Sequence, residues 1–236
     1  MALETLTGYT ENDPSSVVTV AANQITVTTA RKDAEYQVYK DKGAAHFAGD
    51  FTHTVALRYT QWGTYGPCGF CWALANEIVS ANLNTVYPVL FAGGFNWHYT
   101  TSKRIVIGED YGVYDSEYDE WNNALAWDFY GNISLNTWYY LTLERDESVG
   151  TYGTLYGRIY SDADRTNLID TLVISLHAKE DFRYVYAAEG GWWQDLGSST
   201  YTAEFKDLDV GDAGGGPEPG AAARIGSLLG IGLIGL

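Results

Sequence analysis

The chain has 236 residues, and its 30 acidic against 14 basic residues give a net charge of −16 at pH 7. This excess of negative charge repels phosphate backbones and anionic membranes, so nucleic-acid binding is excluded as the main role. The 19 tyrosines, the 26 glycines and the single methionine favour sheets and turns over helices. The length suffices for one large β domain or two small ones, with a core that needs no disulfide staples.

Residues 1–16 are a polar lead-in without the basic start and apolar run of a secretory signal. We therefore expect the protein to be made and first folded in the cytoplasm. From residue 17 to residue 92, short apolar stretches are separated by turn formers, and several alternate with period two, as strands with unlike faces do. The strands expected there are Val17–Val20, Gln24–Thr28, Glu35–Lys40, Asp50–Thr60, Phe70–Asn76 and Val86–Ala92.

Cys68 and Cys71 form a CxxC pair, a spacing found in redox motifs and in halves of zinc sites. The chain has no second cysteine pair, and its four histidines are widely spaced. A redox pair should also open a helix, whereas this one enters an apolar strand. We therefore predict a structural role for the pair, with a local disulfide left open, and assign no metal and no cofactor.

The clearest β signal is the stretch Trp138–Tyr160. In its first half Tyr139, Leu141 and Leu143 fall on one face, and a polar turn with a glycine separates it from a second alternating run. A third apolar stretch, Leu168–Leu176, follows after another turn. Three consecutive strands of this kind predict an antiparallel meander.

The segment from residue 93 to residue 128 is rich in turn formers and aromatic residues. About a dozen short strands without a strong helix predict an all-β fold, an antiparallel β-sandwich or jelly roll that spans residues 17–210. The remaining strands are expected at Lys103–Gly108, Gly112–Tyr114, Phe182–Glu189 and Tyr201–Val210.

The composition changes at Gly211. Residues 211–220 form a linker that two prolines stiffen. In the tail, residues 221–236, the apolar part has twelve residues, short of the roughly 20 that a membrane-spanning helix needs. Because an exposed apolar terminus is an aggregation hazard, we expect it to dock on a neighbouring subunit rather than stay disordered. The expected assembly residues are Ile225, Leu228, Leu229, Ile231, Leu233, Ile234 and Leu236.

Parts of the chain resemble a known family. The run Thr137–Leu141, followed after a charged turn by Leu155–Tyr156 and Ile159–Asp162, is similar to the central hairpin of concanavalin A-like (laminin G-like) lectin and glucanase domains. Tyr201–Val210 resembles the closing strand of those domains. The resemblance covers residues 15–210 and implies a sandwich of the concanavalin A-like type, followed by a C-terminal extension.

The layout also resembles proteins encoded among tailed-phage virion genes. Those begin with a short segment like Met1–Thr5, carry one such sandwich, and end in a short tail after a Gly-rich linker. This resemblance implies a virion structural protein, either a capsid decoration protein or a tail or fibre component. It would lie at the virion surface and assemble through its tail, as a homo-oligomer or with other virion proteins.

Glycan hydrolysis is the enzyme activity that the family resemblance raises. A retaining mechanism needs two carboxyl groups about 5–5.5 Å apart, and the laminarinase-like branch carries them on one strand as E-x-D-x-x-E. The nearest match places Glu117 and Asp119 at the right spacing, but Asn122 stands where the third carboxylate is required. We therefore expect no enzyme activity.

Sugar binding uses aromatic faces that stack on sugar C–H surfaces, and several aromatic residues lie in suitable segments. The alternative for each tryptophan is to cap an open end of the core. The alternative for each tyrosine is to pack beneath a neighbouring element. Loop carboxylates do not complete a calcium signature. The candidate glycan-binding residues are Trp62, Trp97, Trp192, Trp193, Tyr140 and Tyr156.

Three functions follow from these observations. The leading hypothesis is a virion structural protein that displays a lectin-like sandwich, with surface glycan recognition as a secondary role. The second is a stand-alone carbohydrate-binding module, and the third is a laminarinase-type hydrolase. Loss of assembly on deletion of the tail would favour the first over the second.

Overall fold

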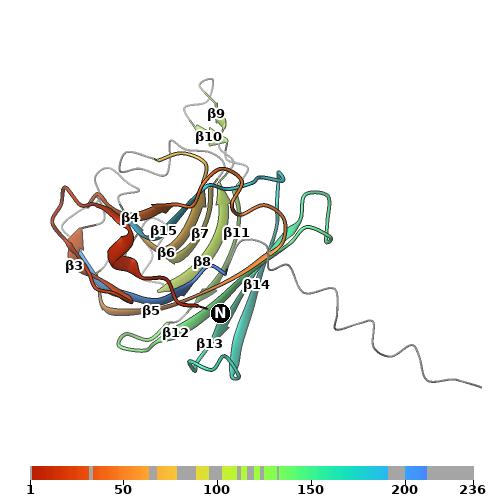
Figure 1. Ribbon diagram of the computed structural model, residues 1–236. Coiled ribbons are helices and arrows are strands. Elements are labelled where there is room, and N and C mark those ends of the chain that lie inside the picture. Colours follow the sequence, from red (N-terminus) through yellow and green to blue (C-terminus); the bar gives the residue numbers. More distant parts are fainter. Residues whose placement is uncertain are drawn as a thin grey trace, which may run out of the picture.

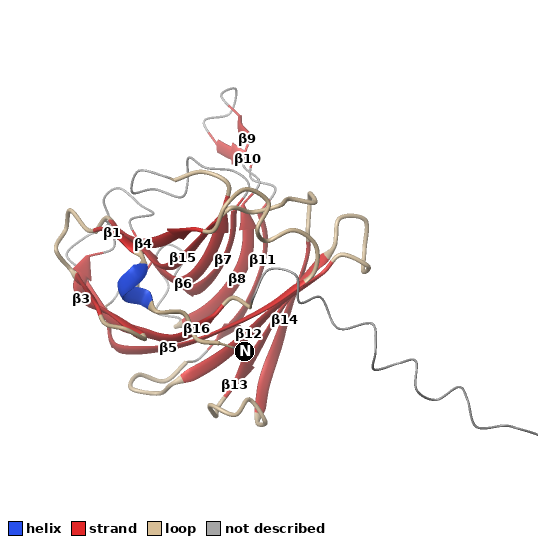
Figure 2. Cartoon of the chain, viewed as in Figure 1, coloured by secondary structure: helices blue, strands red, loops and turns tan. Residues whose placement is uncertain are grey.

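Two antiparallel sheets of seven strands each stack face to face and form a sandwich (Figures 1 and 2). The predicted fold class, an antiparallel β-sandwich, is confirmed. The computed structural model describes residues 2–31, 34–63, 68–78, 89–95, 103–110, 113–115, 120–122, 125–131, 133–190 and 200–211. Within them the only helix is a single 3₁₀ turn, η1 (Leu6–Gly8), so no described helix has the length or the apolar character to cross a membrane.

The first sheet, sheet A, has the strand order β1-β4-β15-β6-β7-β8-β11. A separate hairpin of β9 (Val113–Asp115) and β10 (Glu120–Asn122) projects away from the sandwich (Figure 1). The strands of sheet A are β1 (Thr10–Asn12), β4 (Tyr36–Asp41), β15 (Tyr184–Gly190), β6 (Cys68–Ala75), β7 (Val89–Phe95), β8 (Arg104–Asp110) and β11 (Leu125–Gly131).

The second sheet, sheet B, has the order β14-β13-β12-β5-β16-β3-β2. The predicted meander is confirmed, because β12, β13 and β14 are consecutive neighbours in it. The closing strand β16 pairs with β5 and with β3 near the N-terminus. The strands of sheet B are β14 (Leu168–Ser175), β13 (Thr154–Tyr160), β12 (Tyr139–Asp146), β5 (Phe51–Trp62), β16 (Thr200–Asp209), β3 (Gln24–Arg31) and β2 (Val18–Val20).

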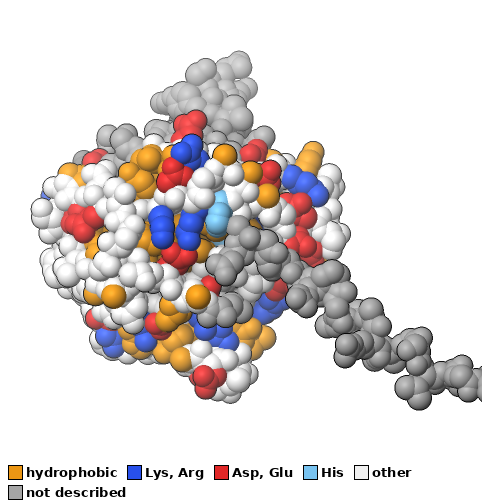
Figure 3. All heavy atoms as spheres, in the orientation of Figure 1, with side chains coloured by type: hydrophobic (Ala, Val, Ile, Leu, Met, Phe, Trp, Pro, Cys, Tyr) orange, Lys and Arg blue, Asp and Glu red, His pale blue; other side chains and the backbone are white. Residues whose placement is uncertain are grey.

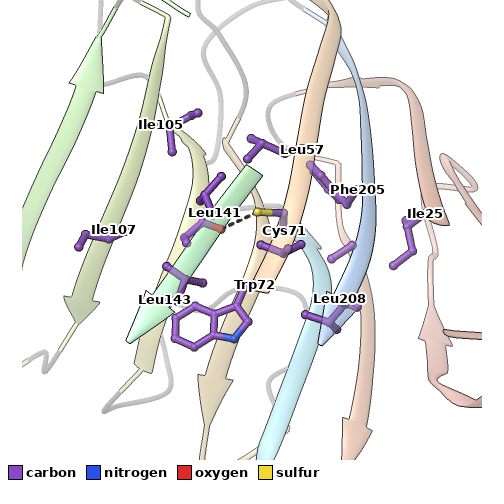
Figure 4. Packing of buried hydrophobic residues seen from close by; sticks show 14 of the residues in the cluster. Ile25, Leu57, Cys71, Trp72, Ile105, Ile107, Leu141, Leu143, Phe205 and Leu208 are labelled. Atoms are coloured by element: carbon purple, nitrogen blue, oxygen red, sulfur yellow. Dashed lines mark hydrogen bonds between the residues drawn. The ribbon is translucent and has the colours of Figure 1, made fainter. Parts of the chain in front are cut away.

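The main core lies between the two sheets (Figure 4). In β12 burial alternates residue by residue, so Leu141 and Leu143 are fully buried and the residues between them are half-exposed. Ile107 of sheet A packs directly over Gly157 of sheet B, where a Cβ would collide with its side chain. Successive residues of a strand therefore point alternately into the core and away from it.

The thiol of Cys71 points into this core, and its Sγ donates to the carbonyl oxygen of Ala92 at 3.4 Å. The cysteine is free and fully buried, and burial raises its pKa to about 12. Both members of the CxxC pair belong to β6, a central strand, as the apolar pattern of this segment predicts. A buried thiol with so high a pKa is inert, which fits a structural role.

The N-terminal segment joins the sandwich earlier than the boundary expected at residue 17. Leu6 is 1% exposed and belongs to the main core. The amide of Glu4 donates to the carbonyl of Leu208 in sheet B, while its carboxylate pairs with Lys40 and Lys42 of sheet A. The segment is polar in composition, but one buried leucine and one carboxylate suffice to connect it to both sheets.

Candidate functional site

Sheet A carries a second, separate cluster of side chains on the face that points away from sheet B, which we call the outer face of sheet A. In it the rings of Tyr39 and Tyr186, on adjacent strands, lie 5.6 Å apart. Two strands further, on β7, the ring of Phe91 lies against Gly108, where a Cβ would be only 2.2 Å from Cζ of the ring. The register places Trp127 of β11 directly beside Gly108. An aromatic row thus crosses sheet A from β4 to β11.

The β11 end of this row is exposed. Trp127 and Phe129 alternate with Ala126 and Asp128, so both rings project from the outer face. They are 42% and 40% exposed, and the rings stack with centroids 5.5 Å apart and planes 25° from parallel. The faces of the two rings are turned toward each other, so the pair presents mainly ring edges to solvent and forms an exposed apolar surface, which we call the platform.

Arg104, which faces outward from β8 beside β11, extends this platform. Its guanidinium carbon lies 4.2 Å from the centroid of the Phe129 ring. Arg104, Phe129 and Trp127 therefore form a stack of three planar groups along the edge of the face. A guanidinium over an aromatic ring is held by cation–π attraction and keeps its N–H groups for partners in its own plane.

The opposite end of the outer face holds buried polar groups. Gln37 of β4 and Glu189 of β15 are direct cross-strand partners, and both are 0% exposed. Phe70 of β6 is the next residue in the same row. Neither polar atom of the Gln37 amide has a hydrogen-bond partner among the described residues. An amide without a partner is costly to bury, and such groups are rare in folded proteins.

Two predicted glycan-binding residues, Tyr140 and Tyr156, lie on the outer face of sheet B, away from this row. Both are half-buried. Lys206 lies 6.0 Å from the centroid of the Tyr140 ring, and Arg158 lies 5.5 Å from that of Tyr156. Lys206 also contacts the ring of Trp138. On this face, seen in part in Figure 3, charged side chains of both signs lie among apolar ones.

Trp62, a third predicted residue, lies at the end of β5 and packs on the main core. Its ring meets the edge of Tyr59 at a centroid distance of 4.9 Å and an angle of 79°. The half-buried indole thus covers an open end of the core, which was the alternative considered for it. Trp97, Trp192 and Trp193 lie outside the described residues, as do all the assembly residues of the tail.

The described residues contain no group of three His, Cys, Asp or Glu side chains that could hold a metal ion. Two carboxylates, those of Asp162 and Glu109, accept hydrogen bonds within the protein. Asp162 accepts backbone hydrogen bonds from Thr166 and Asn167. Glu109 accepts the backbone N–H of His177 at 2.7 Å and contacts its ring, and burial raises the pKa of this carboxyl group.

The residues of the outer face of sheet A were missed at the sequence level. Trp127 and Phe129 lie in a stretch expected to be mainly turns, although Leu125, Trp127 and Phe129 do alternate with other residues. The alternation is obscured because both faces of β11 carry apolar residues. Gln37 and Glu189 lie 152 positions apart in sequence, and only the β4–β15 register brings them together.

Comparison with known proteins identifies the fold type. No family model and no curated protein sequence matches the chain. Solved structures do match, among them the exoplasmic/lumenal domain of VIP36 bound to Ca²⁺ and Man3GlcNAc, at 12% identity and a TM-score of 0.52, covering 86% of this chain and 87% of that one.

Two further solved structures match with a TM-score of 0.50. The legume lectin-like domain from Entamoeba histolytica is 16% identical and covers 86% of this chain and 90% of its own. The alginate lyase Aly36B is 10% identical, with coverages of 84% and 85%. At these identities the likeness concerns the fold alone, and it confirms the predicted lectin-like sandwich of the concanavalin A-like type.

Proposed function

We propose that the protein is a non-enzymatic, lectin-like display protein of a virion, which binds saccharides across the outer face of sheet A. The observation that carries the binding part is the exposed, stacked pair of Trp127 and Phe129 on this face. The fold likeness to lectins supports the same function.

The chemistry of this face suits a sugar. The platform offers exposed aromatic surface for the C–H groups of a pyranose ring. Sites for small ligands commonly combine a largely apolar surface with a few placed polar groups.

Binding is tested by glycan-array screening followed by calorimetry with Trp127→Ala. We expect this variant to lose affinity by about tenfold or more, since a buried aromatic contact contributes over 1 kcal/mol. Tyr152→Ala is the matched control, because Tyr152 is 46% exposed and lies in the turn between β12 and β13. Equal affinity of the two variants for every bound glycan would contradict the proposal.

The non-enzymatic part is supported by the spacing of carboxylates on the face. The buried carboxylates described there are Glu189 on β15 and Asp110 on β8, three strands away. Three strand spacings separate them by about 14 Å, more than the roughly 5–9.5 Å of glycosidase pairs. Incubation with β-glucans and with polyuronates should release neither reducing ends nor unsaturated products. Turnover that Glu189→Gln abolishes would contradict this part.

The virion setting is supported by the sequence layout, a single sandwich followed by a Gly/Pro linker and an apolar tail. Deleting residues 212–236 should abolish self-association or particle incorporation and leave saccharide binding intact. Light scattering measures self-association, and co-purification with particles measures incorporation. Unchanged assembly of the truncated chain would favour a stand-alone carbohydrate-binding module.

A further inference from the structure

One corner of the outer face of sheet A is positively charged in a strongly acidic chain. Lys103 and Arg104 are consecutive, and within the described residues neither has a carboxylate oxygen within 4.0 Å. Three other surface arginines of the sandwich are paired: Arg58 with Glu204, Arg158 with Glu144, and Arg183 with Asp41. With 30 acidic residues available, two unpaired neighbours at one corner form an unusual arrangement.

The acidic residues nearest in sequence and register point elsewhere. Asp128 is on the opposite side of β11, where it accepts the backbone N–H of Val173 at 2.9 Å and that of Phe129 at 2.8 Å. Asp110 is six residues further along β8 than Arg104, a separation of about 20 Å in an extended strand. At physiological salt, charges beyond about 8 Å are largely screened. The net charge of the chain therefore does not determine the local charge at this corner.

The cation is also held in place. The Arg104 guanidinium stacks on Phe129, and Phe129 stacks on Trp127, so the cation lies beside the exposed platform on the same face. A planar guanidinium fixed by a ring loses less freedom on binding and presents several N–H donors to an oxyanion. Lys103 adds a second positive charge at the same end of β8.

From this geometry we propose that the platform binds a sugar that carries an anionic group, a carboxylate or a sulfate, with Arg104 as the specificity-determining residue. One sugar unit packs against Trp127, and an anionic group on a unit further along the oligosaccharide receives hydrogen bonds from the guanidinium, which lies beyond Phe129 in the stack. This inference rests on the proposed saccharide binding and adds the class of sugar. It requires no catalytic step.

The test uses the full-length protein and calorimetry at low and at high salt. Three oligosaccharides of equal length serve as probes: a neutral oligomannoside, an oligomannuronate and a sulfated oligomannoside. We expect an anionic probe to bind at least about tenfold more tightly than the neutral one, the contribution of a charge-assisted hydrogen bond. Salt should reduce this preference.

Variants assign the preference to a residue. Arg104→Gln should lower the affinity for the anionic probe to the affinity that the same variant has for the neutral one. Arg183→Gln is the matched control, since Arg183 is an exposed arginine paired with Asp41. Arg104→Lys should restore part of the preference, because it keeps the charge without the planar group.

The outcomes separate the two proposals. If the protein prefers the carboxylated or the sulfated probe and Arg104→Gln removes that preference, the inference is supported and the anion is identified. Binding of all three probes with equal affinity, or a preference unchanged in Arg104→Gln, overturns the inference and leaves saccharide binding standing. If no glycan binds, the proposed function itself is overturned.

Discussion

At the scale of single residues, the core contains an ionisable side chain, His53, whose protonation is suppressed. Trp72 donates its indole N–H to Nδ1 of His53 at 3.0 Å, which identifies the neutral tautomer with its proton on Nε2. The side chain is 0% exposed, and that Nε2 has no hydrogen-bond partner among the described residues. Burial lowers the pKa of His53 to about 3, and the positive charge of Arg145 adds to the shift.

This shift predicts a stability that depends on pH. The folded-state pKa lies below the unfolded value of about 6.5, so the contribution of His53 is fully present above that pH. It is lost as the pH falls toward 3, since the unfolded chain takes up the proton first. As the pH falls from 6 to 4, the free energy of unfolding should fall more steeply for the protein than for His53→Gln, by up to about 1.4 kcal/mol per pH unit. Urea titrations at each pH measure this free energy for both proteins, and parallel plots of it against pH would contradict the prediction.

Arg145 is the second buried charge, at 1% exposure. Although it follows the buried alternation of β12, its guanidinium leaves the apolar core and donates to the carbonyl oxygens of Phe47, Gly49 and Glu180 at 2.5–2.8 Å. Glu147 supplies an ion pair at 3.4 Å. One side chain therefore holds several loops at this end of the sandwich.

Replacing this arginine should be costly. Arg145→Leu leaves several carbonyl oxygens without their donor, and we expect the free energy of unfolding to fall by about 3 kcal/mol or more. Arg145→Lys should recover only part of the loss, because a single ammonium group cannot reach all the carbonyls. Denaturant titration provides the measurement. A loss below 1 kcal/mol for the leucine variant would show that water replaces these contacts.

At the scale of elements, β11 is the strand that departs most from the prediction, because much of it lies in a segment expected to consist mainly of turns. It forms the edge of sheet A, and Asp128 on its inner side accepts the backbone N–H of Val173 on β14, the edge of sheet B. The strand therefore closes one side of the sandwich and supplies the platform. Edge strands with exposed N–H groups invite aggregation, so a carboxylate that covers one is also protective.

The aromatic row depends on a strand position without a side chain. Gly108→Ala would place a Cβ 2.2 Å from Cζ of Phe91, so the ring must move and the row is disrupted. We expect a loss of about 1–3 kcal/mol in stability, together with weaker saccharide binding. Gly131→Ala is the matched control, because no atom lies within 4 Å of a Cβ there. Equal effects of the two variants would contradict the role of Gly108.

At the scale of the whole molecule, the N-terminal segment ties sheet A to sheet B. Deleting residues 1–8 removes the buried Leu6 and the contacts of Glu4 with Leu208, Lys40 and Lys42. We expect the free energy of unfolding to fall by at least about 2–5 kcal/mol, the usual loss for one large core side chain. Thermal and urea unfolding of the truncated chain measure the effect, and an unchanged midpoint would show that the segment is dispensable.

The sequence by itself determined the fold class, most strands and the inner and outer faces of the central hairpin. These follow from period-two alternation and turn chemistry, which act within a few residues. It also indicated that Cys71 has a structural role, because the surrounding residues are continuously apolar.

Only the tertiary structure decided where the candidate site lies. The stack of Arg104, Phe129 and Trp127 requires the β8–β11 register, and the pairing of Gln37 with Glu189 requires β4 and β15 to be neighbours. Strand order and register depend on contacts between segments far apart in the chain, where no local pattern specifies the partner. The chemistry of single residues was therefore visible in the sequence, whereas their convergence on one face was a property of the fold.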